Sequence, residues 1–364
     1  MLIISLKYSA VYTSHMYALY SAGKDLGVAI KILCHDKYLS DLIEKGANIS
    51  DIISYNPQKN GFLYESLKKE WRQSLKVIAE NGLINCLVMN PHPANAIFLK
   101  DYATYVGGKR FLWLHEPHKT FSEILEYGIT KGVYFFIALL IAKWSVKNIE
   151  QCLLPSTYAL KRFKQYYPTM ASNCSLFPLM FPKITVESKE KLYFSFIGHV
   201  NKGKGIEPFL GLVEYCWKQN LKFKFQIISS TLCEPFLSRA KQFERLNLKI
   251  INKEAINDIE IAEGIASSFA TLCLYTTVTQ SSVVANSMMQ GTPIIASNAG
   301  SLPESIINGK TGYIAENVYD YTSNIKLLEL CIINKDAHQK HCFEEFEKNY
   351  SIDRIKPYLL EIIS

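Results

Sequence analysis

The sequence predicts an α/β protein made of two doubly wound, Rossmann-like domains that face each other across a cleft. Its 364 residues suffice for two domains, each with a core of its own. Short apolar runs alternate with helical spacings along almost the whole chain, and a segment rich in proline and charge interrupts this alternation near the middle. In parallel sheets of this kind, ligands bind at the carboxyl ends of the strands.

The first domain is expected to span residues 1–182. After the first strand, Ser14 is positioned to cap a helix that runs to about Asp25, and Gly27 precedes the second strand. Apolar runs predict the strands of this domain at 2–6, 28–34, 86–89, 110–114 and 152–154.

The second domain is expected to span residues 192–348, after a linker at 183–191. The final segment, 349–364, has helical spacing and is expected to cross back to the first domain. Apolar runs predict the strands of the second domain at 192–197, 223–228, 248–251, 270–275, 293–296 and 312–315.

Charge and cysteine content limit the partners and the compartment. The net charge of +7 comes from dispersed basic residues, and no nucleic-acid-binding signature accompanies it. An anionic membrane surface or a phosphorylated ligand fits this charge. The nine cysteines lie singly, without metal-binding or disulfide-type spacing, which favours a reducing, cytoplasmic environment and no metal site.

One apolar segment raises the question of a membrane. Residues 133–142 are ten uninterrupted apolar residues, flanked by Lys131, Lys143 and Trp144. The segment is too short to span a bilayer, which takes about 20 residues. Two interpretations remain, a buried core helix or a helix that lies in the membrane interface.

Two segments of the second domain have the pattern of an anion site. Residues 196–205 read Phe-Ile-Gly-His-Val-Asn-Lys-Gly-Lys-Gly, a strand followed by a glycine turn, basic residues and the beginning of a helix. Residues 280–316 contain Gly-Thr-Pro-Ile-Ile-Ala, Gly-Ser-Leu-Pro-Glu and Asn-Gly-Lys-Thr-Gly around two further helix beginnings. Backbone N–H groups and the helix dipole at such positions favour a bound phosphate.

These motifs strongly resemble the donor half of GT-B fold glycosyltransferases, in particular family 4, of the group 1 type. The resemblance implies that the second domain binds a nucleotide diphosphate sugar and the first binds the acceptor. Lys204 matches the family lysine that grips the diphosphate, His199 stands at the position of the family arginine, and Lys202 can supply the missing charge. The implied contacts with the rest of the donor are Thr279, Gln280, Ser281, Ser282, Val283, Asn286 and Glu304.

The sequence departs from this family at two further positions and in one loop. The family usually carries two glutamates before Gly-Thr-Pro, and their places hold Val278 and Asn286. The amide of Asn286 can still hydrogen-bond the ribose hydroxyls, whereas Val278 cannot replace a carboxylate. The loop at 7–13 also lacks the glycines that the family uses to approach the diphosphate.

The acceptor side of the resemblance rests on residues that follow strands of the first domain. His115 best matches the family histidine that touches the donor sugar, with Glu116 and His118 beside it, and His92 follows the preceding strand. Ser156 matches a family serine but fits the cap of a helix equally well.

The resemblance implies a retaining, metal-independent hexosyltransferase, with no cofactor beyond its nucleotide sugar. His115, Lys204 and His199 are the implied catalytic residues. The apolar segment at 133–142 suggests a lipid-linked glycan acceptor on the inner face of the cell membrane, as in O-antigen, lipopolysaccharide, capsule or exopolysaccharide synthesis. Two alternatives remain, a weakened sugar-nucleotide-binding subunit that supports a partner transferase and a nucleotide-sugar epimerase. Walker, dehydrogenase and hydrolase motifs are absent from the sequence, as is Asp-x-Asp.

Overall fold

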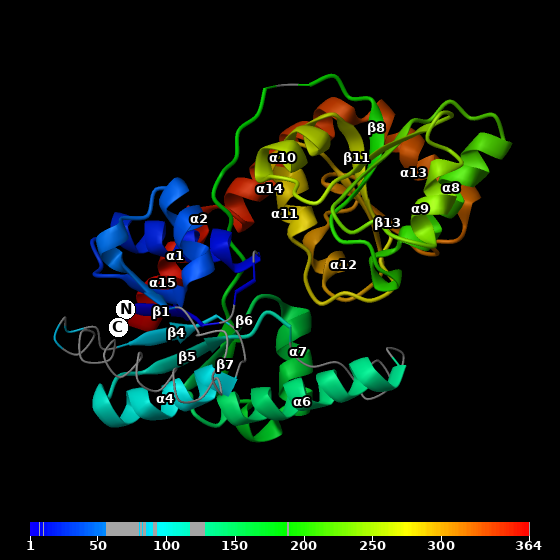
Figure 1. The fold of residues 1–364 in the computed structure, drawn as a ribbon. Helices are drawn as coiled ribbons and strands as arrows, with labels where there is room; N and C mark the ends of the chain where they lie inside the picture. Colours follow the sequence, from blue (N-terminus) through cyan, green and yellow to red (C-terminus); the bar gives the residue numbers. More distant parts are fainter. Residues whose placement is uncertain are drawn as a thin grey trace. The chain divides into compact units, whose positions relative to one another are not determined.

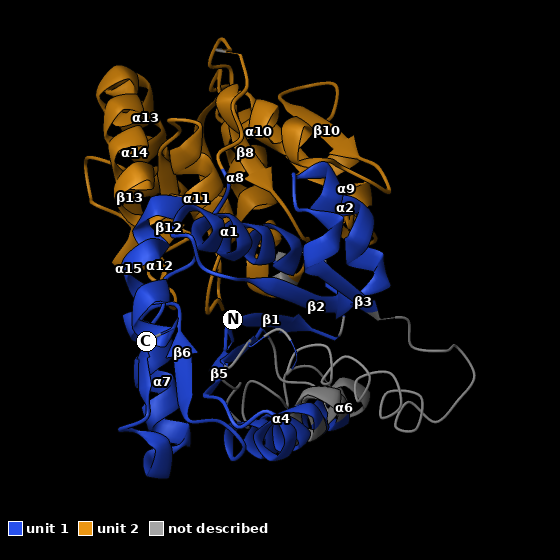
Figure 2. Ribbon diagram, turned by 90° about the vertical axis from the view of Figure 1, so that its left-hand side faces the viewer, with its two compact units in different colours: residues 1–182, 352–364 blue, residues 183–351 orange. Residues whose placement is uncertain are grey.

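The computed structural model describes residues 1–6, 8–9, 11–55, 80, 82, 85–89, 93–116, 128–187 and 189–363. The chain divides into two compact units, which Figure 2 shows in two colours. Unit 1 comprises residues 1–182 and 352–364, and unit 2 comprises residues 183–351. Each unit is a parallel sheet covered by helices, so the two-domain α/β fold predicted from the sequence is confirmed.

Unit 1 contains a seven-stranded sheet in the order β3-β2-β1-β4-β5-β6-β7. All of its strand pairs are parallel. The order reverses between β1 and β4, so the loops that follow these two strands diverge to opposite faces of the sheet. The strands are β1 (Leu2–Ser5), β2 (Lys31–His35), β3 (Ile52–Tyr55), β4 (Cys86–Val88), β5 (Arg110–Trp113), β6 (Gln151–Leu154) and β7 (Cys174–Leu176).

Helices cover both faces of this sheet. In Figure 1, α1, α2 and α15 lie on one side of the strands, and α4 and α6 lie on the other. The last helix returns to unit 1, where it packs beside α1 and pairs Lys356 Nζ with Asp25 Oδ2 at 2.9 Å. The helices are α1 (Val11–Asp25), η1 (Asp36–Tyr38), α2 (Leu39–Glu44), η2 (Ile49–Asp51), α4 (Pro93–Tyr105), α6 (Gly128–Val146), α7 (Thr157–Tyr166), η3 (Pro168–Met170) and α15 (Ile352–Ile363).

Unit 2 repeats this topology with a six-stranded sheet in the order β10-β9-β8-β11-β12-β13. Its order reverses between β8 and β11, two neighbouring parallel strands. The crevice at their carboxyl ends is where sheets of this type bind ligands. The strands are β8 (Tyr193–Ile197), β9 (Phe225–Ser229), β10 (Leu248–Asn252), β11 (Ser268–Cys273), β12 (Ile294–Ser297) and β13 (Gly312–Ala315).

Two helices of unit 2, α10 and α13, begin at side chains that accept backbone hydrogen bonds. Asn257 and Glu260 form a capping box at the beginning of α10, and Asp320 caps α13. Such caps satisfy N–H groups that the helix itself leaves unpaired. The helices are η4 (Lys202–Lys204), α8 (Ile206–Lys218), α9 (Phe236–Lys241), α10 (Asp258–Ala266), α11 (Ser282–Met289), α12 (Leu302–Ser305), α13 (Tyr321–Ile333) and α14 (Lys335–Asn349).

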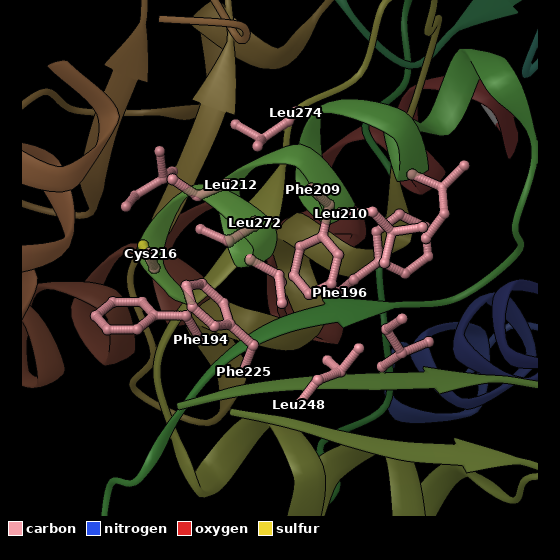
Figure 3. Packing of buried hydrophobic residues seen from close by; sticks show 14 of the residues in the cluster. Phe194, Phe196, Phe209, Leu210, Leu212, Cys216, Phe225, Leu248, Leu272 and Leu274 are labelled. Carbon is pink, nitrogen blue, oxygen red and sulfur yellow. The ribbon is translucent and has the colours of Figure 1, made fainter. Parts of the chain in front are cut away.

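Aromatic and branched side chains fill the core of unit 2. Phe194, Phe196 and Phe225 project from β8 and β9 toward Phe209 on α8, as Figure 3 shows. All four rings are almost completely buried. A core of this kind fixes the strands, and therefore the loops at their carboxyl ends, in one arrangement.

Some elements differ from the prediction. The first long helix begins at Val11, and Ser14 therefore lies inside its first turns, so the predicted cap is wrong. The helix begins early because Tyr12 N already donates to Ser9 O at 2.9 Å. Two short strands, β3 and β7, were not predicted, because runs of three or four residues carry little periodic signal.

Of the two interpretations of residues 133–142, a helix buried on all sides does not fit the described side chains. These residues lie within α6, yet Val133, Phe136, Ile137 and Leu140 are 48–56% exposed. A uniformly apolar sequence does not show which side of a helix faces the core, and here a described part of that surface faces outward. Within the described residues, no helix is long and apolar enough to cross a membrane.

Candidate functional site

The loop after β8 folds into a compact turn before α8. Lys204 N donates to Asn201 Oδ1 at 2.9 Å, and Val200 N donates to Thr231 Oγ1 at 2.8 Å. Gly205 caps α8 with a φ of +74°, a left-handed conformation that strongly favours glycine. These contacts fix the backbone that carries Lys204 at the carboxyl end of the sheet.

The loop after β11 lies directly against this turn. Gly203 O accepts hydrogen bonds from Thr276 N at 3.0 Å and from Thr277 N at 3.3 Å. A Cβ atom on Gly203 would lie 2.6 Å from Thr277 Oγ1, and one on Gly205 would lie 2.0 Å from Leu274 O. Glycines at these two positions therefore allow the two loops to meet at the point where the strand order reverses.

A lysine and a tyrosine meet at this junction. Lys204 Nζ lies 4.5 Å from the centroid of the Tyr275 ring, within the range of a cation–π interaction. Tyr275 is held at two points, because its OH lies 3.2 Å from Ser281 Oγ and its backbone O accepts a hydrogen bond from Ser297 Oγ at 2.5 Å. Burial raises the pKa of Tyr275 well above its usual value, so the phenol is neutral and the ring face attracts the ammonium group.

The beginning of α11 and the loop after β12 complete this region of unit 2. Ser281 precedes α11 without forming a side-chain cap. A Cβ atom on Gly198 would lie 3.7 Å from Val283 Cγ2, and one on Gly300 would lie only 1.7 Å from Val278 O. The glycine turn after β8, the start of α11 and the loop after β12 are therefore close neighbours of the loop after β11.

The remaining residues predicted to contact the donor occupy the same loops and helices. His199 and Glu304 have exposed side chains, and Lys202 lies in η4 with a side chain outside the described set. The half-buried residues are Thr279, Gln280, Ser282 and Asn286.

In unit 1, His115 lies in a cluster of rings at the carboxyl end of β5. Its ring centroid is 4.3 Å from that of Trp113, 5.0 Å from that of Tyr12 and 5.1 Å from that of His15. Tyr12 and His15 are one turn apart on α1, so this helix supplies half of the cluster. Trp113 is fixed in turn, because its Nε1 donates to Phe177 O at 3.1 Å.

Both histidines of this cluster are neutral. Burial lowers the pKa of His15 to about 4, although the hydrogen bond between its Nδ1 and Met180 O at 2.8 Å acts in the opposite direction. Burial and the neighbouring His15 lower the pKa of His115 well below its usual value. His115 Nε2 is buried and has no hydrogen-bond partner among the described residues. The cluster thus contains a neutral imidazole with an unused polar atom.

The other residues predicted on the acceptor side are only partly placed. Glu116 is exposed, and its charge adds to burial in raising the pKa of Tyr12. His92 and His118 lie outside the described residues. Ser156 Oγ accepts from Ala159 N at 3.1 Å and so caps α7, as one of its two interpretations predicted.

Sequence reasoning missed Tyr275, His15 and Tyr12. Tyr275 was visible as the last residue of an apolar strand run, where a polar group reaches the carboxyl edge of the sheet. No comparable signal marks Tyr12 or His15, because both look like ordinary residues of an amphipathic helix. Their proximity to His115 comes from the packing of α1 beside the strands.

A known family model matches almost the whole of unit 2. The family model of glycosyl transferases group 1 matches residues 180–346. A Klebsiella pneumoniae sequence described as an uncharacterized 41.2 kDa protein in the cps region is 23% identical over 258 residues, 67% of this chain and 68% of that protein.

Solved structures with the same fold extend over the whole chain. Anabaena Alr3699/HepE, crystallised with UDP-glucose, superimposes with a TM-score of 0.70 at 13% identity, covering 100% of this chain and 98% of that one. A point mutant of S. aureus TarM, in complex with fondaparinux, alpha-GlcNAc-glycerol and UDP, has a TM-score of 0.70 at 11% identity, covering 100% and 99%. The two parallel sheets with their flanking helices therefore have the GT-B fold.

Proposed function

We propose that this chain, a glycosyltransferase of the group 1 type with the GT-B fold, transfers a hexose-type sugar from a nucleotide diphosphate sugar to a glycan acceptor. The observation that carries the proposal is Lys204, held over Tyr275 where the loops after β8 and β11 meet. A cation fixed beside helix N-termini suits a diphosphate. The UDP-glucose bound by the Anabaena protein supports a nucleotide sugar as the donor.

The donor would be held by charge and by backbone dipoles. Lys204, with Lys202 and His199 on the same loop, would face the diphosphate. The beginning of α11 would add its N–H groups, from Ser281 to Val283, and the loop at 279–280 would contact phosphate and sugar. Asn286 would hydrogen-bond the ribose, and Glu304 on α12 would contact the sugar.

The proposed reaction retains the configuration at the anomeric carbon. The bond between this carbon and the diphosphate oxygen breaks, and the acceptor hydroxyl oxygen forms its new bond on the same face of the sugar. The departing phosphate oxygen takes the hydroxyl proton, so no protein nucleophile is needed. Lys204 and the helix N-termini would stabilise the negative charge that develops on the leaving diphosphate.

His115 would hydrogen-bond the transferred sugar rather than the diphosphate. A neutral imidazole can donate one hydrogen bond and accept another, and its unpaired Nε2 is suited to a sugar hydroxyl. Glu116, His92 and His118 would lie on the acceptor side of the same unit. The proposal thus assigns charged groups to the phosphates and neutral polar groups to the sugar.

We further propose that the acceptor is a lipid-linked glycan and that the protein works on the inner face of the cell membrane, in the synthesis of a surface polysaccharide such as capsule, exopolysaccharide or O-antigen. The cps region named for the Klebsiella pneumoniae relative supports this context. The reaction would need no metal or other cofactor, because charged side chains and backbone dipoles take the place of Mg²⁺ at the diphosphate. Turnover is therefore expected to survive EDTA, and a metal requirement that added Mn²⁺ restores would contradict this part of the proposal.

Nucleotide binding and turnover test the proposal directly. UDP at about 100 times its Kd is expected to stabilise the protein by about 2.7 kcal/mol. With UDP-glucose and other nucleotide sugars as donors, release of the nucleoside diphosphate measures turnover. Lys204→Ala is expected to lower kcat by about 10²–10³-fold, since it removes one group that stabilises the leaving charge.

Lys218→Ala is the matched control, because Lys218 lies at the far end of α8, where it pairs with Glu214. It is expected to leave kcat unchanged. Near-wild-type turnover in Lys204→Ala would place the diphosphate elsewhere. Nucleotide binding without turnover, whichever acceptor is supplied, would favour the alternative of a sugar-nucleotide-binding subunit that supports a partner transferase. Formation of a new nucleotide sugar in the absence of acceptor would favour the epimerase alternative.

A further inference from the structure

Helix α6 carries an unusual concentration of exposed apolar side chains. Among the described residues, five of the eighteen exposed large apolar side chains belong to α6, and no other helix or strand carries more than two. They are Val133, Phe136, Ile137, Leu140 and Trp144, at 42–56% exposure. We call these five residues the α6 face. Scattered exposed apolar residues need no explanation, but a cluster of this kind indicates a binding surface.

The α6 face forms one continuous stripe along the helix. Its members are spaced at intervals of three, four, seven and eleven residues from Val133, which places them within an arc of about 100°. The buried residues Ala142, Ser145 and Val146 lie on the opposite side, and Val146 joins the main core of unit 1. The helix lies beside α4 at the outer side of the sheet (Figure 1). It is therefore attached to the core by one side and exposed by the other.

The charges around the α6 face indicate what covers it. Residues 128–147 contain lysines but no acidic residue. Lys143 and Lys147 are exposed beside Trp144 at the end of the helix. A tryptophan and lysines bordering an apolar stripe fit the headgroup level of a bilayer that contains anionic lipid. A second copy of the same face offers no carboxylate for these lysines, so it is the poorer partner.

We infer that the α6 face binds the surface of a bilayer that contains anionic lipid, with the helix lying in the interface. The described residues contain no spanning helix, so the contact would be peripheral. The inference rests on the proposed function in one respect, because a lipid-linked acceptor would lie in the membrane that the α6 face binds. It also adds to that function, since it names the surface by which unit 1 would reach the acceptor.

Vesicle binding by the full chain tests this inference. Wild-type protein is expected to co-sediment with vesicles of phosphatidylcholine and phosphatidylglycerol, and to be released as salt shortens the screening length from about 10 Å at 0.1 M to about 3 Å at 1 M. Phe136→Ser with Leu140→Ser is expected to weaken binding by about tenfold or more, since two contacts with the lipid are lost. The control is Ile43→Ser with Ile49→Ser, two exposed apolar residues of unit 1 outside the α6 face, which is expected to bind like wild type.

A charge-reversed variant and a fluorescence measurement separate lipid from protein partners. Lys143→Glu with Lys147→Glu is expected to weaken binding to anionic vesicles while the protein stays folded. Tryptophan fluorescence of the wild type is expected to shift to the blue on binding, and Trp144→Phe is expected to lose this shift. Wild-type protein that does not co-sediment with vesicles would overturn the inference. So would a wild-type oligomer that dissociates in the Phe136→Ser, Leu140→Ser variant, because the α6 face would then bind a second copy of the chain. No nucleotide sugar is present in these assays, so their failure leaves the proposed transfer reaction untouched, and failure of turnover leaves the lipid contact untouched.

Discussion

The two units share one topology but place different chemistry at the carboxyl ends of their strands. In unit 2, glycine loops meet at the reversal of strand order and hold a lysine over a tyrosine ring. In unit 1, His115 after β5 and His15 on α1 are two neutral histidines in contact among buried rings. One region thus offers charge on a tight backbone, and the other offers neutral polar atoms in a dry environment. In the proposed function, the charged region of unit 2 would bind the diphosphate and the neutral region of unit 1 would bind the sugar.

The first prediction tests the backbone half of this comparison and has the largest expected effect. A Cβ atom at Gly205 would lie 2.0 Å from Leu274 O, a backbone atom that cannot move without displacing β11 and its loop. Gly205→Ala is therefore expected to lower the free energy of unfolding by about 4 kcal/mol or more. Chemical denaturation of the purified protein measures this loss.

Gly309→Ala is the matched control for Gly205→Ala. Gly309 has nearly the same φ, +76° against +74°, but no atom lies within 4 Å of its added Cβ. It should lose only the roughly 1–2 kcal/mol that a left-handed conformation costs an ordinary residue. Equal losses in the two variants would show that the contact between the loops after β8 and β11 adds nothing beyond backbone strain.

The second prediction tests the neutral half of the comparison. The pKa of His15 is about 4 in the folded protein and is near its usual 6.5 in the unfolded chain. Between these values only the unfolded chain binds the proton, so stability is lost as the pH falls from about 6.5 to about 4. The difference corresponds to about 3 kcal/mol of unfolding free energy. His115, whose pKa is lowered in the same direction, adds to this loss.

Denaturation curves at several pH values measure this loss. His15→Gln is expected to weaken the dependence on pH by up to about 3 kcal/mol over this interval, because it removes one of the two titrating groups. His341→Gln, at a partly exposed position of α14, is the control and is expected to follow the wild type. If His15→Gln keeps the full acid sensitivity, then His15 is not the group that controls it.

The two regions also differ in how much the sequence reveals about them. The turn between β8 and α8 of unit 2 lies within ten consecutive residues, 196–205. Its glycines and Lys204 could therefore be recognised from the sequence alone. Tyr275 lies about seventy residues further on and reaches Lys204 only because β8 and β11 are neighbours in the sheet. The ring cluster of unit 1 comes from α1, β5 and residues 177–181. Because these segments lie far apart in the sequence, no local pattern could predict it.

Burial was the property that the sequence predicted least well. The apolar run at 133–142 favoured a core helix, because hydrophobicity alone does not distinguish a side chain that faces the core from one that faces outward. Likewise Ser14 had the residue type of a cap, but backbone hydrogen bonding had already begun the helix three residues earlier. The predicted α/β alternation and the strand runs were more robust, since they depend on many residues at once.

The last prediction separates the contribution of the Tyr275 hydroxyl from that of its ring and has the smallest expected effect. Tyr275→Phe removes the hydroxyl that lies 3.2 Å from Ser281 Oγ and should lower the free energy of unfolding by about 1 kcal/mol. The ring remains under Lys204, so the affinity for UDP, measured by calorimetry, is expected to stay within about threefold of wild type. Tyr275→Leu also removes the ring face, and with it a cation–π contact of about 0.5–2 kcal/mol. UDP affinity is then expected to fall several-fold, because Lys204 loses the surface that orients it. Equal affinities in the two variants would mean that the loop backbone alone positions Lys204, and the charged site of unit 2 would then depend on its glycines rather than on its tyrosine.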